Sequence, residues 1–228
     1  MQGQLVLVSA ALFWVALHAG LAGSPLRWRL VGRLGENGFR GLFSLLSALG
    51  LTWLIMAYRS VPTVPLWNGA PALHGLAVAG MLPVFLLFAG SLTRPNPTAA
   101  GGETRLPGNP QGMQRITRHP MLNAFALWAA LHLLANGDSA SVIFFGSILA
   151  TALLGMPSID RKLAHRRLRE WAALRDRTSA LPFGAILAGR NRLVLREIGV
   201  LTPGLGLLGW ILLLLAHPWL FGVPALPG

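Results

Sequence analysis

The fold of this chain is decided by Arg115-Ile116-Thr117-Arg118-His119-Pro120, the apolar segment 121–135 behind it, and the polar turn Asn136-Gly137-Asp138. The apolar run is long enough to form a membrane-spanning helix, with His119 at its start and His132 near its end. Ionisable side chains inside a span are costly in lipid and are usually functional. We therefore interpret this stretch as a histidine-bearing span, around which the rest of the chain gathers as further spans.

The composition points the same way. The chain has 228 residues, of which 54% are hydrophobic and 11% are charged, and its mean hydropathy is +0.58. Soluble domains carry about 25% charged residues. We therefore predict a single integral membrane domain over residues 1–228, with membrane lipid as a partner. The net charge of +12 does not indicate nucleic acid, because the arginines lie between apolar runs. Since the chain has no cysteine, thiolate metal sites, disulfides and cysteine catalysis are excluded.

Six apolar runs each approach the roughly 20 residues that cross a bilayer. They cover residues 4–22, 41–58, 69–92, 119–135, 139–156 and 198–217. The predicted fold is therefore all-α, a polytopic transmembrane helix bundle of about six spans. If the spans alternate in direction, 18 of the 19 Lys and Arg residues fall on one side and Arg59 alone falls on the other. The positive-inside rule then places both termini on the non-cytoplasmic side of a multi-pass protein.

Two connections carry further signals. Residues 27–40 hold four arginines and are predicted to be a basic loop. Ser158 is a plausible N-cap with Asp160 in the first turn behind it, and apolar and basic residues then alternate at helical spacing. We expect a separate amphipathic helix there, lying along the cytoplasmic interface. Asn136-Gly137-Asp138 predicts a tight turn between two spans.

Histidines are the main candidates for chemistry, because the acidic residues all lie in loops or at helix ends. His165 sits among arginines and His217 ends the last span, so neither is favoured. Four others lie within spans or at their mouths: His18, His74, His119 and His132. Neutral imidazole is a common metal ligand, haem iron takes axial histidine, and helix bundles commonly hold such cofactors.

Depth in the membrane limits which histidines can pair. His18 and His119 lie near the basic side, whereas His74 and His132 lie towards the other side. The same-depth pairs are therefore His18 with His119 and His74 with His132. At about 1.5 Å per residue, His18 and His132 differ in height by roughly 14 Å, which only a haem lying near the membrane plane could bridge. Periodicity and topology leave these pairings open.

The motifs together resemble those of the NnrU family of bacterial membrane proteins, which also includes 15-cis-zeta-carotene isomerase. The residues that carry the resemblance are spread over the whole chain: 17–21, 40–44, 115–120, 127–132, 135–138, 160–163, 177–183, 189–190 and 216–218. The resemblance implies a haem b protein of the bacterial inner (cytoplasmic) membrane that isomerises a polyene by cis–trans conversion at a redox-gated haem. It assigns His18 and His132 as the axial metal ligands, His74 as a residue that exchanges with one of them, and His119 to a shared Arg-His-Pro motif.

Two other functions stay open at this stage. Bacterial members of the family are associated with denitrification, which would make the chain a non-catalytic factor or sensor that binds nitric oxide. The Arg118-His119-Pro120 motif also resembles one in S-adenosylmethionine-dependent membrane methyltransferases of the isoprenylcysteine and phospholipid type. Those enzymes carry a pair of glutamates where this chain has Ile159-Asp160.

Overall fold

Long apolar helices make up most of the computed structural model, which describes residues 2–22, 24–67, 71–94, 96–99 and 109–226. The long helices are α1 (Gln2–Val15) with its π-helical continuation η1 (Ala16–Leu21), α2 (Leu26–Ser60), α3 (Pro71–Thr93), α5 (Pro120–Asn136), α6 (Ser139–Arg166) and α10 (Leu201–Phe221). Among the described residues there is no strand. The all-α prediction is therefore confirmed.

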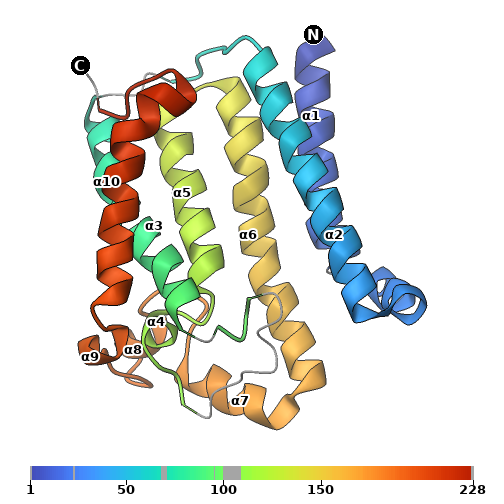
Figure 1. Ribbon diagram of the computed structural model, residues 1–228, viewed down its shortest axis with the longest axis vertical. Helices are drawn as coiled ribbons and strands as arrows, with labels where there is room; N and C mark the ends of the chain where they lie inside the picture. Colours follow the sequence, from blue (N-terminus) through green and yellow to red (C-terminus); the bar gives the residue numbers. More distant parts are fainter. Residues whose placement is uncertain (1, 23, 68–70, 95, 100–108, 227–228) are drawn as a thin grey trace.

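Five of these helices are long and apolar enough to cross a membrane, counting α1 with η1 as one and searching the described residues only. The remaining long helix, α5, has 17 residues and lies between α3 and α6 in the middle of the bundle (Figure 1). It corresponds to the fourth of the six predicted spans. The predicted bundle of about six apolar helices therefore matches the observed architecture.

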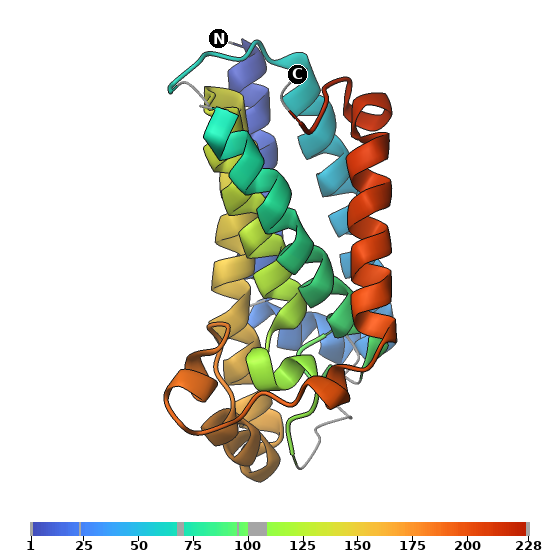
Figure 2. The same cartoon turned by 90° about the vertical axis from the view of Figure 1, so that its left-hand side faces the viewer.

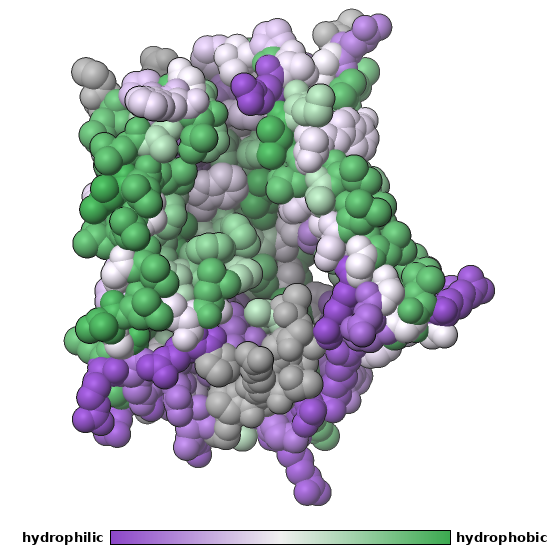
Figure 3. Space-filling model, in the orientation of Figure 1, coloured by the Kyte–Doolittle hydropathy of each residue, from purple (hydrophilic) through white to green (hydrophobic). Residues whose placement is uncertain are grey.

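The long helices stand side by side in the order α2, α1, α6, α5, α3, α10, which is not their order along the chain. Figures 1 and 2 show this row curving, so that α2 and α10 form its two ends. The face between these two helices is hollowed and is lined mainly by apolar residues (Figure 3). Leucines on α2 and α10 are exposed, for example Leu45, Leu49 and Leu212.

The α5–α6 connection confirms the predicted tight turn. Gly137 ends α5 in the left-handed conformation, with φ of 65°, which favours glycine. The Asp138 side chain then caps α6 by accepting a hydrogen bond from the Ser141 backbone N–H at 2.9 Å. The backbone N–H groups of Leu66 and Trp67 donate to the Gly137 carbonyl oxygen, so the loop before α3 closes over this turn.

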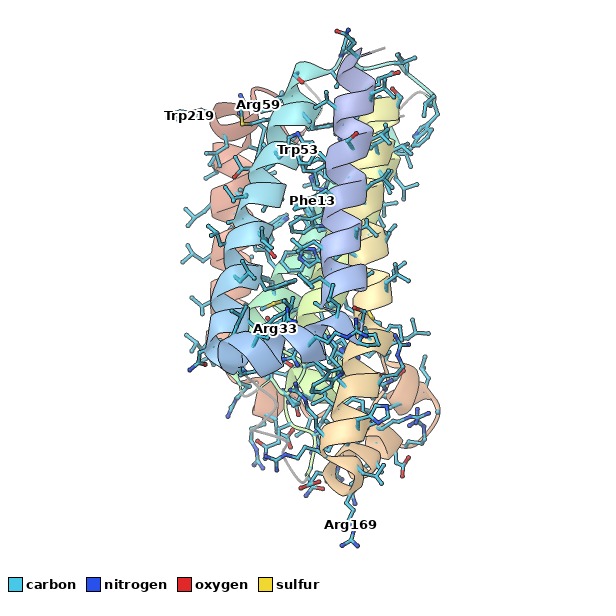
Figure 4. The ribbon with its side chains drawn as sticks, turned by 90° about the vertical axis from the view of Figure 1, so that its right-hand side faces the viewer. Phe13, Arg33, Trp53, Arg59, Arg169 and Trp219 are labelled. Atoms are coloured by element: carbon cyan, nitrogen blue, oxygen red, sulfur yellow. The ribbon has the colours of Figure 1, made fainter. Side chains whose placement is uncertain are left out.

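Short helices and irregular loops cover the opposite, basic end of the bundle. They are α4 (Met113–Ile116), α7 (Leu168–Arg177), α8 (Gly184–Leu187) and α9 (Leu195–Ile198). Hydrophilic residues gather at this end below the apolar band in Figure 3. Arg33 and Arg169 lie here, whereas Arg59 and Trp219 lie at the other end (Figure 4). The sequence-based separation of charge is thus reproduced in space.

The predicted basic loop over residues 27–40 is wrong, because these residues are helical. They form the start of α2, which kinks where Gly35 adopts φ of 71° and ψ of 169°. Arg27 is buried, because its guanidinium pairs with Glu36 and lies 5.0 Å from the centre of the Phe39 ring. A charged side chain with such partners is compatible with helix packing, which the charge pattern alone does not reveal.

The predicted helix start at Ser158 is also wrong. Helix α6 continues through Pro157 and Ser158 to Arg166, and the Ser158 side chain is buried. The amphipathic segment instead breaks at Arg167, where α7 begins at a new angle. Leu163 on α6 packs against Trp171 and Leu174 on α7, and this buried cluster holds the two helices together. Tertiary packing therefore overrides the local capping signal.

Candidate functional site

His18 and His132 occupy matching local environments. Each lies four residues, about one helical turn, after a tryptophan: His18 after Trp14 and His132 after Trp128. In both cases the Nδ1 atom of the histidine lies 2.9 Å from the backbone carbonyl oxygen of that tryptophan. A carbonyl oxygen can only accept a hydrogen bond, so Nδ1 carries the proton and, in the neutral ring, Nε2 keeps its lone pair. That tautomer is the one in which Nε2 can bind a metal.

The helix around His18 departs from regular α geometry. Residues 16–21 form the π-helix η1, and the Ala22 backbone N–H donates to the Leu17 carbonyl oxygen. Single π-helical turns within α-helices frequently mark functional sites. His132, by contrast, lies within the regular α-helix α5. The shared feature of the two histidines is therefore the bond to tryptophan rather than the type of helix.

Aromatic rings fix the orientation of both histidines. The His18 ring lies 4.1 Å from the Trp14 ring and 5.2 Å from that of Phe43. The His132 ring lies 5.1 Å from the Trp128 ring and 4.9 Å from that of Phe145, on which it stacks. Trp14, Trp128 and Phe145 all belong to one apolar cluster built from α1, α2, α5 and α6. The two histidines therefore flank the same core.

The two rings have different neighbours and lie at different heights. His18 lies near the basic end of α1, whereas His132 lies one turn before the opposite end of α5. The difference in height of roughly 14 Å, predicted at about 1.5 Å per residue, stays a sequence-based estimate. The assignment of both as ligands of one metal stays a prediction. His74, in the first turn of α3, lies at the same end as His132 and is partly buried.

These donors fit a haem better than a bare metal ion. Within the described part of the chain, no group of three or more His, Cys, Asp or Glu side chains is placed to hold a metal ion. A porphyrin supplies four nitrogen ligands itself and needs only one or two from the protein. His18 and His132 make no hydrogen bond through Nε2 to another described residue, and each is held by a carbonyl oxygen and contacts aromatic rings, so each could supply one such ligand.

His119 lies in a different setting. It is fully buried, and its Nε2 atom lies 2.7 Å from Oδ1 of Asp160. Arg118 binds the same carboxylate, with Nη2 2.6 Å from Oδ2. His119 Nδ1 is buried and has no hydrogen-bond partner among the described residues. The sequence did not predict this Arg118–Asp160–His119 network, and a role of His119 as a cofactor ligand stays a prediction.

The same network joins segments that are about 60 residues apart in sequence. The Arg118 backbone N–H donates to the Ser179 carbonyl oxygen at 2.9 Å, and the Phe183 N–H donates to the Ile116 carbonyl oxygen at 2.8 Å. The Asn123 side-chain amide donates to the Ala180 carbonyl oxygen at 2.9 Å. Sequence reasoning missed Asn123, although a polar side chain at the start of an apolar span must find partners and could have signalled the contact.

A second ion pair ties α4 to α9 at the basic end. Arg115 binds Glu197 through two hydrogen bonds, Nε to Oε2 at 2.6 Å and Nη2 to Oε1 at 2.8 Å. The Gly112 backbone N–H donates to the same carboxylate at 3.1 Å. The hydrogen bonds from Arg115 are the main reason that the pKa of Glu197 falls from 4.5 to about 2. Glu197 is therefore ionised at any physiological pH.

The bundle and its histidines define the chain as a polytopic membrane protein with candidate cofactor ligands in its apolar core. The profile of the family described as NnrU protein matches residues 6–225, so the chain belongs to the NnrU family. It is 29% identical over 196 residues to the chloroplastic 15-cis-zeta-carotene isomerase of Arabidopsis thaliana, and 28% identical over 195 residues to that of Zea mays. These alignments cover 82% and 83% of this chain and 52% of each relative.

The chain thus spans about half the length of these curated relatives. No solved structure matches it.

Proposed function

We propose that this chain is a haem b-binding membrane protein that isomerises a polyene double bond by cis–trans conversion. The observation that carries the proposal is the pair of Trp–His units, in which His18 and His132 each keep Nε2 available for a metal. The relatives that are named as carotene isomerases support the choice of a polyene as substrate. Bound haem would supply an iron whose coordination changes with its redox state.

The chain's own residues would hold and shield the site. The carbonyl oxygens of Trp14 and Trp128 fix the tautomer and angle of the two imidazoles, which raises their basicity as ligands. The surrounding apolar cluster would limit access of water, and low polarity around a bound haem would tune its redox potential. His74 would be the residue that replaces one of the two ligands when the iron is reduced.

The hollowed face of the bundle supports entry of a polyene from the membrane. Apolar residues line the hollow between α2 and α10, and a hydrophobic substrate dissolved in lipid would reach it without crossing water (Figure 3). We further propose that the arginine-rich end faces the cytoplasm of a bacterium, as the positive-inside rule predicts. Reporter fusions at the two termini would test this orientation.

A reduced-minus-oxidised absorption spectrum of the purified protein tests the haem assignment. Wild-type protein should carry haem b, and His18→Ala and His132→Ala should each lose most of it. His165→Ala is the matched control, because His165 is exposed at the basic end, and it should keep wild-type haem content. His18→Gln keeps a donor for the Trp14 carbonyl oxygen and separates ligand loss from misfolding. Unchanged haem content in both alanine variants would refute the assignment.

The same preparation separates isomerisation from gas binding. Turnover of a cis-polyene only after reduction would support the isomerase. Reduced protein that binds nitric oxide and leaves every polyene unchanged would instead support the non-catalytic role in nitric oxide metabolism. We do not propose methyl transfer, because the single carboxylate of Asp160 is already bound by Arg118 and His119.

A further inference from the structure

The basic end contains two neighbouring cavities outside the histidine-bearing core. The larger has a volume of about 620 Å³ and the smaller a volume of about 400 Å³, and Arg190 lines both. We call the smaller one the arginine cavity. Among the described residues its lining includes four arginines, Arg115, Arg177, Arg190 and Arg192, and no acidic residue.

The charge of the arginine cavity is largely uncompensated. Arg115 is neutralised by Glu197, which lies next to the cavity. Arg177, Arg190 and Arg192 have no ion-pair partner within the described part of the chain. Glu197 also interacts electrostatically with Arg192, but the described lining of the cavity contains four arginines and no carboxylate. Such an excess of like charge favours binding of an anion.

Hydrogen bonds to the backbone hold the walls of the cavity. Asn191 is central, because its side-chain oxygen accepts from Arg115 Nη1 at 2.9 Å and its side-chain nitrogen donates to the Arg177 carbonyl oxygen at 2.8 Å. Arg190 Nη1 donates to the Asp176 carbonyl oxygen at 2.6 Å, at the end of α7. The side chains of Arg115, Arg177 and Arg190 are therefore held in place by hydrogen bonds to neighbouring residues.

Guanidinium groups remain available inside this frame. Arg190 uses only Nη1 in these contacts, which leaves Nε and Nη2 as donors. Arg177 uses Nη1 to contact the side-chain oxygen of Asn109 and keeps its other donors. Arg192 donates its backbone N–H to the Asn191 side-chain oxygen, and its guanidinium makes no hydrogen bond to another described residue. Such forked donors match the oxygens of phosphate.

We propose that the arginine cavity binds a phosphate group, with Arg177, Arg190 and Arg192 as its ligands. This site is independent of the proposed haem and of the isomerase reaction. Its position at the polar end of an apolar bundle allows two sources of the phosphate, the headgroup of an anionic lipid or a soluble phosphate compound. Both sources present the same chemistry to the three arginines, and the experiment separates them.

The test uses the full chain with Arg177→Gln and Arg192→Gln combined. These two substitutions remove two ligands and leave Arg115 and Arg190, whose hydrogen bonds hold the fold. The matched control combines Arg33→Gln with Arg169→Gln. It makes the same change in net charge at the same end of the molecule, at two exposed arginines that line neither cavity (Figure 4).

Binding is measured with two probes. Inorganic pyrophosphate is titrated into detergent-purified protein by calorimetry, and native mass spectrometry compares retention of phosphatidylglycerol with that of phosphatidylcholine. We expect wild type to bind at least one phosphate probe, the Arg177/Arg192 variant to bind it about tenfold or more weakly, and the Arg33/Arg169 control to stay within about twofold. Selective phosphatidylglycerol retention identifies a lipid headgroup, and pyrophosphate binding alone identifies a soluble compound.

Two results would overturn the proposal. One is that wild type binds neither pyrophosphate nor phosphatidylglycerol in preference to phosphatidylcholine. The other is that both double variants weaken binding equally, because the effect would then come from the general positive field of this end. A normal melting temperature of the Arg177/Arg192 variant is the check that its cavity is still folded.

Discussion

Asp160→Ala gives the sharpest test of how the basic end is held together. The carboxylate of Asp160 receives hydrogen bonds from Arg118 and from His119, at 2.6 and 2.7 Å. The side chains of Arg118, His119 and Asp160 are only 11%, 0% and 20% exposed. Removing the carboxylate leaves a guanidinium and an imidazole with little access to water and no acceptor in its place.

Breaking a buried ion pair by removing one partner costs about 3–5 kcal/mol. Asp160 is partly exposed, so we expect a loss near the lower limit, about 3 kcal/mol. A chain of this size loses about 2–4 °C of melting temperature per kcal/mol, which predicts a fall of about 6–12 °C. Because the three side chains share one carboxylate, the double variant Arg118→Ala/Asp160→Ala should lose less than the sum of the two single variants.

Thermal unfolding in detergent, followed by tryptophan fluorescence, measures this change directly. Asp176→Ala is the matched control: Asp176 is an exposed acid on α7 without an ion-pair partner among the described residues. We expect that variant to melt within about 1–2 °C of wild type, since surface substitutions usually stay within about 0.5 kcal/mol. If Asp160→Ala has the same melting temperature as the Asp176→Ala control, the network contributes nothing to stability and the reasoning from its geometry is refuted.

Two further predictions concern the turn and the second ion pair. Gly137→Ala should destabilise the protein by about 2 kcal/mol, because the alanine would have to keep a positive φ and its Cβ would lie 2.5 Å from the Trp67 carbonyl oxygen. Gly146→Ala, with open space around the new Cβ, should not destabilise the protein, and melting temperatures of the two variants test this difference. The pKa of Glu197 in the folded protein is about 2, below its ordinary 4.5, so the stabilisation from its pairing with Arg115 is complete above pH 4.5 and is lost as the pH falls towards 2. Between pH 6 and pH 3, Glu197→Gln should therefore lose less melting temperature than wild type, and an equal loss in both proteins would contradict this.

The membrane helices were predictable from sequence because the signal is physical and local. Runs of about 20 apolar residues must be helical in lipid, since each backbone polar group has to be satisfied within its own segment. The turn at Asn136-Gly137-Asp138 was predictable for a related reason, because Gly137 adopts a positive φ and Asp138 caps the next helix. Both features depend on a few consecutive residues and on no distant contact.

The errors arose where distant contacts decide the local structure. Residues 27–40 contain charges that indicate a loop, but the segment is helical. Arg27 pairs with Glu36 and its guanidinium lies over the Phe39 ring. Ser158 has the identity of an N-cap, but α6 continues through it to Arg166, and Leu163 beyond it packs against Trp171 on α7. Neither contact can be read from the residues near the predicted boundary.

The candidate site could be predicted only in part from the sequence, for the same reason. The four-residue spacing from Trp14 to His18 and from Trp128 to His132 is visible in the sequence, and a helix brings such residues onto one face. The hydrogen bonds between residues 115–123 and 178–183 are not visible, since most of them use backbone atoms that carry no sequence signature. Only Asn123, a polar side chain in an apolar run, gave a hint.

The separation of these two regions affects how variants of the family's shared motifs should be interpreted. The histidines flank an apolar core, whereas Arg118, His119, Asp160 and the segment 177–183 meet at the basic end, where they join α5, α6 and the loop after α7. A substitution in the second region would loosen the helices that position His132 without changing His18 or His132 themselves. Lost activity in an Arg118 or His119 variant therefore supports a catalytic role only if melting temperature and haem content are unchanged. Lost haem with an unchanged melting temperature is instead the result expected of His18 and His132.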